Sequence, residues 1–331
     1  MESDSAAHAT GGANAGWLEH LLAIPDAARL ARFEATAGTV LFREGDPGDF
    51  FLVVLEGEAD VQLRDNHIVT VGAGSVLGEL ALLTGNTRST TVVARTPLVS
   101  YRGTAQDFIE LLEIDSVREH FTHLAASRLA ENVVPVPFNG RNGFVGEMRP
   151  LLPTDRSAFL ELLARLSPAS RRKRFFSAAP PSDRLIEYLL YVDFVDHFAW
   201  VVLDTSTTPH SGCGIARFIR NHENPHSAEV AFAVIDDRQG QGLGTIMLGA
   251  LAVAADAAGI TTFTAEVLDD NTAMRKVFQK ASPTWSRPEP GVVTAQFAVS
   301  DAEATLDSEL RCALITSTQG IGVTAATALR L

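Results

Sequence analysis

The chain has 331 residues, about twice the length of an average domain, so we expect two domains. Its composition, 46% hydrophobic and 20% charged, is that of a globular protein and excludes a disordered, collagen-like or coiled-coil chain. The net charge of −13 argues against binding to a nucleic-acid backbone. No apolar run reaches the roughly 18 residues of a membrane-spanning helix. Residues 1–16 lack an export signal, so we expect a flexible tail on a cytoplasmic protein that binds no membrane.

Two residue types bear on metal binding and on basic surfaces. The only cysteines, Cys213 and Cys312, are too few for a tetrahedral zinc site or a disulfide framework, so we expect packing roles and no metal. The chain has three lysines, Lys173, Lys276 and Lys280, beside 24 arginines. We interpret this arginine excess as a compositional bias of the genome and not as a functional signal.

The first half of the chain has a β pattern. Short runs of alternating apolar residues, separated by glycine turns, extend over residues 39–101, which is typical of a small antiparallel barrel or jelly roll. An amphipathic helical pattern follows over residues 105–133 and ends at prolines. We assign residues 17–134 to the first domain. Residues 135–142, rich in proline, glycine and asparagine, are predicted to form a linker.

The second half alternates strands and helices, which is typical of an α/β domain. Strand patterns occupy residues 143–152, 198–203, 213–219, 229–235, 263–268 and 291–299. Helical patterns cover residues 182–191, 246–259 and 271–282, and another follows the cap residues 154–155. A further helical pattern lies at the start of the C-terminal tail. We assign residues 143–300 to this domain and residues 301–331 to an extension that could act as a lid.

The segment GELALLTGNTRSTTV, residues 78–92, has features that suit a cyclic phosphodiester. Gly78 and Glu79 open a short helix whose free N–H groups attract an anion, and the guanidinium of Arg88 offers paired donors. A glutamate cannot bind phosphate, but it can accept a hydrogen bond from a ribose hydroxyl. The segment resembles the phosphate-binding cassette of the cyclic-nucleotide-binding domain family, and the resemblance covers residues 17–133.

This resemblance implies that Glu79 binds the ribose 2′-hydroxyl of cAMP and that Arg88 binds its cyclic phosphate. The remaining cAMP contacts that it implies are Gly78, Leu80, Ala81, Ser89 and Thr90. The helix that follows supplies candidates for contacting the base: Arg128, Asn132, His123 and His120. The alternative is a barrel that binds no nucleotide, in which Glu79 and Arg88 pair with each other.

A second glycine turn, residues 239–245, joins a strand to an apolar helix. A dinucleotide-binding turn is disfavoured because the next strand does not end on the required acidic residue. The turn resembles the Q/R-x-x-G-x-G/A turn of the GNAT superfamily of acyl-CoA N-acyltransferases, in which N–H groups at a helix start bind a pyrophosphate. The resemblance covers residues 144–299. The contacts to acetyl-CoA that it implies are Phe232, Ala233, Val234, Gln239, Gly240, Gln241, Gly242, Leu243, Gly244, Thr245 and Asn271, of which the last could instead cap a helix.

Acetyl transfer to a lysine requires a neutral amine, whereas a lysine amine has a pKa of about 10.4, so a nearby base is useful. Glu229 holds the position of the catalytic glutamate that the resemblance implies, among apolar residues expected to raise its pKa. The alternative is a surface glutamate on an edge strand. Asp196 and His197 could form a second acid–base pair, although the apolar run favours a packed histidine. The basic run 171–174 could bind the 3′-phosphate or an acidic substrate, or be a solvated helix face.

The segments SPASRRKRFF and YVDFVDHFAWVVL are similar to those of the cAMP-regulated protein lysine acetyltransferases of mycobacteria. The likeness implies acetyl transfer from acetyl-CoA to exposed lysines of partner proteins, with acyl-CoA synthetases and universal stress proteins as substrates. We therefore predict a cAMP-regulated protein lysine acetyltransferase. Two alternatives remain: a small-molecule amine acetyltransferase under cyclic-nucleotide control, and a catalytically silent cAMP-binding sensor or regulator. Residues 280–283 depart from the glycine-containing turn that is usual in the family.

Overall fold

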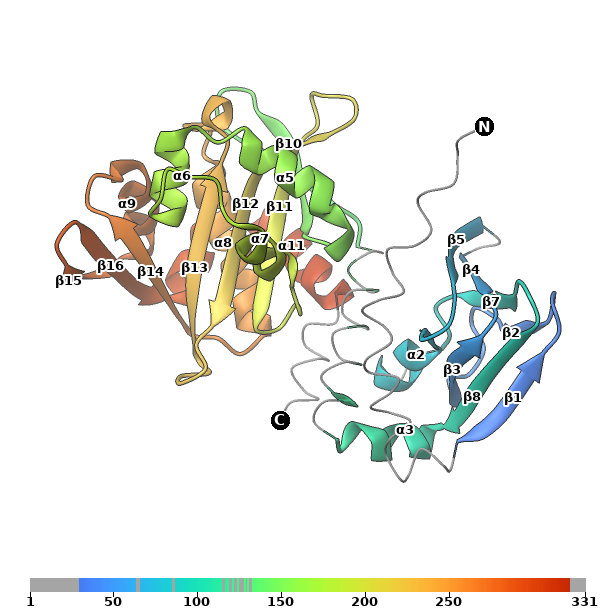
Figure 1. Cartoon of the computed structure of the whole chain (residues 1–331). Coiled ribbons are helices and arrows are strands. Elements are labelled where there is room, and N and C mark those ends of the chain that lie inside the picture. The colour runs from blue at the N-terminus through green and yellow to red at the C-terminus, as the bar shows by residue number, and fades with distance from the viewer. Residues whose placement is uncertain are drawn as a thin grey trace. The chain divides into compact units, whose positions relative to one another are not determined.

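The computed structural model describes residues 30–321, except residues 64–65, 85–86 and, within 115–132, all positions other than 117, 118, 121, 124, 128 and 130. The chain divides into two compact units, Met1–Ala125 and Ala126–Leu331 (Figure 1). The predicted tail, residues 1–16, lies outside the described residues.

The first unit contains two four-stranded antiparallel sheets with strand orders β1-β8-β3-β6 and β2-β7-β4-β5. Its strands are β1 (Ala31–Ala35), β2 (Val40–Phe42), β3 (Phe50–Glu56), β4 (Ala59–Leu63), β5 (Asn66–Val71), β6 (Val76–Leu77), β7 (Thr91–Ala94) and β8 (Leu98–Thr104). Two described helices are α2 (Glu79–Thr84) and α3 (Ala105–Leu112). The predicted mainly-β first domain with flanking helices is confirmed.

Strand β3 separates two hydrophobic clusters of this unit because side chains alternate between the faces of a strand. Phe51 and Val53 belong to the cluster that includes Phe108 of α3, and the rings of Phe51 and Phe108 lie 5.4 Å apart. Leu52 and Val54 belong to the cluster on the opposite face. The buried apolar run of β3 therefore reflects a strand covered on both faces.

The second unit contains one eight-stranded sheet with the order β15-β16-β14-β13-β12-β11-β10-β9, in which only β13 and β14 are parallel. Its strands are β9 (Val136–Asn139), β10 (Val145–Pro150), β11 (His197–Asp204), β12 (Ser211–Arg220), β13 (Ser227–Val234), β14 (Thr262–Leu268), β15 (Thr284–Glu289) and β16 (Val292–Ala298). Its α-helices are α5 (Arg156–Ala164), α6 (Pro168–Phe175), α7 (Asp183–Leu190), α8 (Leu243–Ala257), α9 (Thr272–Phe278), α10 (Val299–Glu303) and α11 (Ser308–Gly320). Short 3-10 helices are η2 (Pro153–Asp155), η3 (Asp236–Arg238) and η4 (Gln279–Ala281). The predicted α/β second domain is confirmed.

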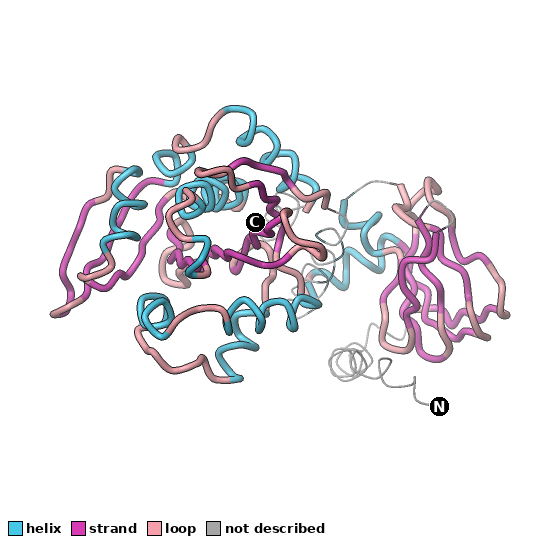
Figure 2. The backbone as a smooth tube through the Cα atoms, turned by 90° about the horizontal axis from the view of Figure 1, so that it is seen from above, coloured by secondary structure: helices cyan, strands magenta, loops and turns pink. Residues whose placement is uncertain are grey.

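Helices cover both faces of this sheet (Figure 2). On one face α8 packs against β11, where Trp200 Nε1 donates a hydrogen bond of 3.0 Å to the carbonyl of Ala250. On the other face α5 packs against β12, with the Arg217 guanidinium 5.9 Å from the Phe159 ring. Glu229 shares this second face with Arg217, because it lies opposite Ile219 in the register of β13 and β12.

Strands β13 and β14 separate along their length (Figure 1). Strand β13 pairs with β12 over residues 228–234, but with β14 only over residues 227–229. Beyond Glu229 one backbone edge of β13 therefore pairs with none of the described strands. Strand β13 also contacts α8, which follows it after η3 and the glycine turn.

The segment predicted as a linker contributes a strand to the second unit. Residues 136–139 form β9, which pairs with β10 at the edge of the sheet. Val136 and Phe138 are buried, whereas Pro137 between them is exposed. Proline is tolerated on an edge strand because its missing N–H breaks no ladder bond. The proline-rich composition therefore marks an edge strand here.

Residues 301–321 also belong to the core of the second unit. Helices α10 and α11 pack against α8. A Cβ atom on Gly249 of α8 would overlap the side chain of Leu306, and Leu314 of α11 is fully buried. Residues 301–321 of the predicted lid are thus packed against the second unit, and its residues 322–331 lie outside the described part of the chain.

Candidate functional site

The cassette of the first unit brings a buried glutamate and a buried arginine together. Gly78 has a φ of +85°, which favours glycine, and α2 begins at the next residue. Glu79 and Arg88 are 0% and 2% exposed. Arg88 Nη1 donates to the carbonyl of Gly78 and Nη2 to that of Phe50, each at 2.8 Å. The guanidinium also lies over the rings of Phe42 and Phe50 at 4.5 and 4.6 Å.

The Arg88 side chain is buried, which affects the pKa of its guanidinium. Burial lowers the pKa of Arg88, while Asp49, Glu79 and Asp46 act in the opposite direction. The buried Nε atom makes no hydrogen bond among the described residues. The backbone of Arg88 is fixed by the preceding loop, since its N–H donates to the Asp46 carbonyl at 2.9 Å and its carbonyl accepts from Gly45. Sequence reasoning did not anticipate this loop contact.

The other predicted cAMP residues differ in their exposure to solvent. Of the cassette residues, Ala81 is buried, Leu80 and Thr90 are half-buried, and Ser89 is exposed. The helical residue Arg128 is half-buried. The remaining base candidates lie outside the described residues: His120, His123 and Asn132.

A cavity of about 370 Å³ lies in the second unit, between β13, β14, α6 and the start of α8. The predicted residues that line it are Glu229, Phe232, Ala233, Val234, Gln239, Gly240, Gly242, Leu243, Gly244, Thr245 and Asn271. Gln241 does not line it. Its side-chain Oε1 is buried, and its carbonyl accepts a hydrogen bond of 2.7 Å from the N–H of Arg141. Arg141 itself lines the cavity and was missed because it lay in the predicted linker.

The glycine turn has the geometry of an anion-binding helix start. Gly240 and Gly242 have φ values of +77° and +87°, which favour glycine. Helix α8 begins at Leu243, and the first N–H groups of a helix have no partner within it. Gln239 fixes the turn, because its Nε2 donates to the Val234 carbonyl at 3.0 Å and to Ser170 Oγ at 3.1 Å.

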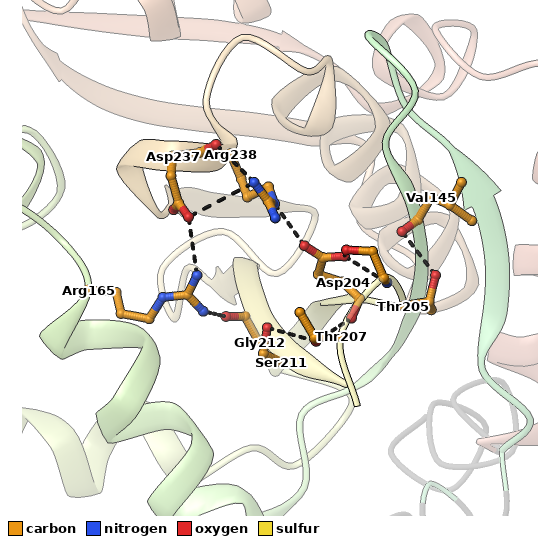
Figure 3. A network of polar contacts seen from close by, with 10 residues as sticks. Val145, Arg165, Asp204, Thr205, Thr207, Ser211, Gly212, Asp237 and Arg238 are labelled. Carbon is orange, nitrogen blue, oxygen red and sulfur yellow. Dashed lines mark hydrogen bonds and ion pairs between the residues drawn. The ribbon is translucent and has the colours of Figure 1, made fainter. Parts of the chain in front are cut away.

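Ion pairs anchor η3, the residues just before this turn (Figure 3). Arg238 Nε donates to Asp204 Oδ2 at 2.7 Å, and Arg165 Nη2 lies 3.5 Å from Asp237 Oδ2. Burial alone would raise the pKa of Asp204, but hydrogen bonds from Ser206 and Arg238 hold it below its ordinary value. The turn is therefore tied to the ends of β11 and α5.

Helix α6 forms a wall of the cavity and is held at both ends. Its N-cap residue Ser167 donates through its N–H and Oγ to Asp236, at 3.0 and 2.7 Å, and Ser170 Oγ donates to the same carboxylate at 3.0 Å. Near its other end Arg172 Nη1 donates to Asp270 at 2.8 Å. These contacts join residues 66 to 98 positions apart, which the sequence pattern did not predict.

Glu229 is accessible to solvent where it lines the cavity, but the surrounding residues remove part of its hydration. Its pKa is raised by loss of hydration and by the charge of Glu266, while Arg174 acts in the opposite direction. Burial lowers the pKa of Arg174 to about 10, so this residue remains a cation at neutral pH. The carboxylate of Glu229 thus has an acidic and a basic neighbour.

Asp196 and His197 do not form an acid–base pair. His197 Nε2 accepts a hydrogen bond of 2.8 Å from Arg217, and Asp196 Oδ1 accepts one of 2.7 Å from Arg220. Burial and the charge of Arg217 lower the pKa of His197 to about 3. His197 is a neutral packed residue.

Asn271 lines the cavity and also caps α9, because its Oδ1 accepts a hydrogen bond of 3.3 Å from the Met274 N–H. Cys213 is buried, and burial raises the pKa of its thiol to about 12. Cys312 is exposed, so its predicted packing role is wrong. Among the described residues, no three His, Cys, Asp or Glu side chains gather closely enough to hold a metal ion.

Two family profiles match the two units. The cyclic nucleotide-binding domain profile matches residues 32–115, and the acetyltransferase (GNAT) domain profile matches residues 147–282. Fold and site thus define a GNAT acetyltransferase that carries a cyclic nucleotide-binding domain. The chain is 36% identical over 279 residues to acetyltransferase Pat of Mycolicibacterium smegmatis, with 83% of each chain covered. It belongs to the Pat acetyltransferase family.

Further comparisons agree with both domains. A solved structure of the cAMP-binding acyltransferase from Mycobacterium smegmatis is 32% identical, with a TM-score of 0.51 over 93% of this chain and 92% of that chain. A cAMP-dependent protein kinase regulatory subunit of Eremothecium gossypii is 44% identical over 62 residues, 19% of this chain and 14% of that protein. The two domains indicate cAMP binding and the use of acetyl-CoA. Within the described residues, every helix is too short or too polar to cross a bilayer.

Proposed function

We propose that the chain transfers acetyl groups from acetyl-CoA to the ε-amines of lysines in partner proteins, under the control of cAMP. The observation that carries the proposal is that Glu229 and the glycine turn line one cavity in a chain with a cyclic nucleotide-binding domain. The similarity to acetyltransferase Pat supports it. Acyl-CoA synthetases and universal stress proteins are the substrate classes we propose to test.

The residues that line the cavity fit acetyl-CoA. The N–H groups at the start of α8 suit the pyrophosphate, because a helix N-terminus attracts anions and Gly240 and Gly242 allow close approach. The backbone edge of residues 230–234, without a partner strand, suits hydrogen bonds to the pantetheine amides. Asn271 contributes a further polar contact.

Glu229 is the proposed general base. It takes a proton from the lysine ammonium, directly or through water, and the neutral amine nitrogen attacks the thioester carbonyl carbon. The carbon–sulfur bond then breaks, the acetyl group stays on the amine, and CoA leaves as the thiolate, which takes up a proton. A raised pKa brings the carboxylate closer to working pH, which suits a proton acceptor. Neither cysteine lines the cavity, so the transfer is direct.

In the first unit, we assign Glu79 to the ribose 2′-hydroxyl and Arg88 to the cyclic phosphate of cAMP. The buried Arg88 Nε, which has no hydrogen bond among the described residues, fits an anionic acceptor. A phosphate would also offset the cost of burying the guanidinium.

Regulation requires an element that cAMP can bias between two arrangements. The described part of the C-terminal extension, which was predicted to act as a lid, packs against α8. Helix α6 lines the cavity, and its Arg174 lies close enough to Glu229 to influence the pKa of that carboxyl. We propose that cAMP changes acetyl transfer through α6.

The test is Glu229→Gln. We expect it to retain acetyl-CoA affinity and to lose transfer to a lysine-bearing protein by about a hundredfold near neutral pH, because the base is gone. Glu161→Gln, an exposed α5 glutamate away from the cavity, is the control and should keep the wild-type rate. Wild-type transfer by Glu229→Gln would contradict the assignment. Transfer to small amines alone would favour the small-molecule alternative.

A further inference from the structure

All three lysines of the chain line the acetyl-transfer cavity. Lys173 comes from α6, Lys276 from α9 and Lys280 from η4. A lysine side chain is the acceptor of the proposed reaction, whereas a guanidinium stays protonated and cannot accept the acetyl group. Every lysine of the chain is therefore a lining residue of this cavity, and the inference drawn from this rests on the proposed function.

Two of these lysines belong to the wall that carries the glycine turn. Lys280 Nζ donates a hydrogen bond of 2.9 Å to Thr245 Oγ1 in the first turn of α8. Lys276 lies four residues earlier, on the preceding helical turn. The Lys280 ammonium therefore lies beside the start of α8, at the proposed pyrophosphate site.

Lys173 belongs to α6, another element that lines the cavity. The α6 residues that line the cavity are Ser170, Lys173 and Arg174, a spacing that puts them on one helix face. The other two cations of the basic run are held elsewhere. Arg171 donates to the carbonyls of Ala178 and Leu166, and Arg172 pairs with Asp270. No hydrogen bond or ion pair within the described residues holds the Lys173 amine.

Lys173 is also close in the chain to the residue that faces the base. Arg174 lies near enough to Glu229 for its charge to lower the pKa of that carboxyl, and α6 packs against β13. Lys173 precedes Arg174 and has a flexible four-carbon stem. Its amine can therefore approach the cavity end where Glu229 lies.

We propose that Lys173 is a self-acetylation site, modified in cis by the active centre of its own chain. Glu229 removes one proton from the Lys173 ammonium, and the amine attacks the thioester carbonyl of acetyl-CoA. The carbon–sulfur bond breaks, N-acetyl-Lys173 forms, and CoA leaves with a proton. Acetylation removes one positive charge from the cavity wall beside Glu229.

The experiment incubates the full chain with acetyl-CoA, with and without cAMP, and measures acetylation of each lysine by peptide mass spectrometry. A lysine-bearing protein substrate is assayed in parallel. We expect one acetyl group on Lys173 and at least tenfold less on Lys276 and Lys280, which serve as references within the same chain. The rate per chain should be independent of enzyme concentration, as for a reaction in cis. Lys173→Arg should abolish incorporation at this position, and Glu229→Gln should slow it about a hundredfold.

Three results would overturn the inference. The first is an unmodified Lys173 under both conditions while the substrate protein is acetylated. The second is Lys173 acetylation at the same rate in Glu229→Gln, which would show chemical acylation without the active centre. The third is a rate per chain proportional to enzyme concentration, which would show transfer between chains. Absence of transfer both to Lys173 and to the substrate protein would overturn the proposed function as well.

Discussion

Glu229 has two charged neighbours that move its pKa in opposite directions. Glu266 and loss of hydration raise it, and Arg174 lowers it. A general base must be ionised, so a raised pKa moves the acidic limb of activity above the ordinary glutamate value of about 4.3. The local charge pattern, and not Glu229 alone, therefore sets the working pH of the proposed base.

Arg174→Met and Glu266→Gln should shift this acidic limb in opposite directions. Removing the cation raises the pKa of Glu229 further and moves the limb to higher pH, whereas removing the anion lowers that pKa and moves the limb to lower pH. The measurement is kcat/KM for acetyl transfer against pH. Shifts in the same direction, or unchanged limbs in both variants, would contradict the role of Glu229.

His197 predicts a pH dependence of stability. Its pKa falls from 6.5 to about 3 on folding, so between these pH values His197 is protonated in the unfolded chain and neutral in the folded chain. The free energy of unfolding is therefore unaffected by the protonation of His197 above pH 6.5. It decreases as the pH falls toward 3, by up to about 1.4 kcal/mol per pH unit. His197→Gln should flatten the dependence of unfolding free energy on pH in this window. An unchanged slope would show that folding does not lower the pKa of His197.

At the scale of elements, sequence patterns predict the features that are formed by residues close together in the chain. The turn at residues 239–245 was assigned because its glycines and the following helix start are neighbours in the chain. Strand β9 was assigned to a linker, since a proline on an edge strand has the same composition as a proline in a loop. The cavity wall formed by α6 depends on Asp236 and Asp270, distant residues that no local pattern connects to it.

Leu314→Ala tests the structural role of α11. Leu314 is fully buried and Leu160, on α5, is 38% exposed, so the two substitutions remove the same atoms from different surroundings. We expect Leu314→Ala to lower the free energy of unfolding by about 2–5 kcal/mol and Leu160→Ala by about 0.5 kcal/mol or less. Urea unfolding followed by fluorescence reports this, because Trp200 lies in the core of the same unit. Equal losses would show that α11 is a detachable extension.

Arg88→Lys tests the assignment in the cassette. Lysine keeps the positive charge but lacks the planar guanidinium with its paired N–H donors. We therefore expect at least tenfold weaker cAMP binding in calorimetry. Arg95→Lys changes an exposed arginine of the same unit that pairs with Glu58, and it should bind cAMP as the wild type does. If both variants keep the wild-type affinity, the phosphate is bound elsewhere.

At the scale of the whole molecule, the two fold classes were predicted from sequence because each carries its own glycine-marked motif. Coupling between the units was not predictable in the same way, because fusing two domains does not make them interact. It requires that cAMP bind two arrangements of the chain with different affinity. Coupling free energies of about 1–3 kcal/mol correspond to changes of roughly 5- to 150-fold.

The most direct test measures the rate of acetyl transfer from acetyl-CoA to a lysine-bearing protein substrate, with and without saturating cAMP, in the wild type, Arg88→Lys and Glu229→Gln. The account predicts that cAMP changes the wild-type rate at least fivefold. It predicts that Arg88→Lys responds only at higher cAMP concentrations, and that Glu229→Gln is slow under all conditions. A wild-type rate that stays constant while calorimetry shows the nucleotide site saturated would contradict cAMP control of acetyl transfer.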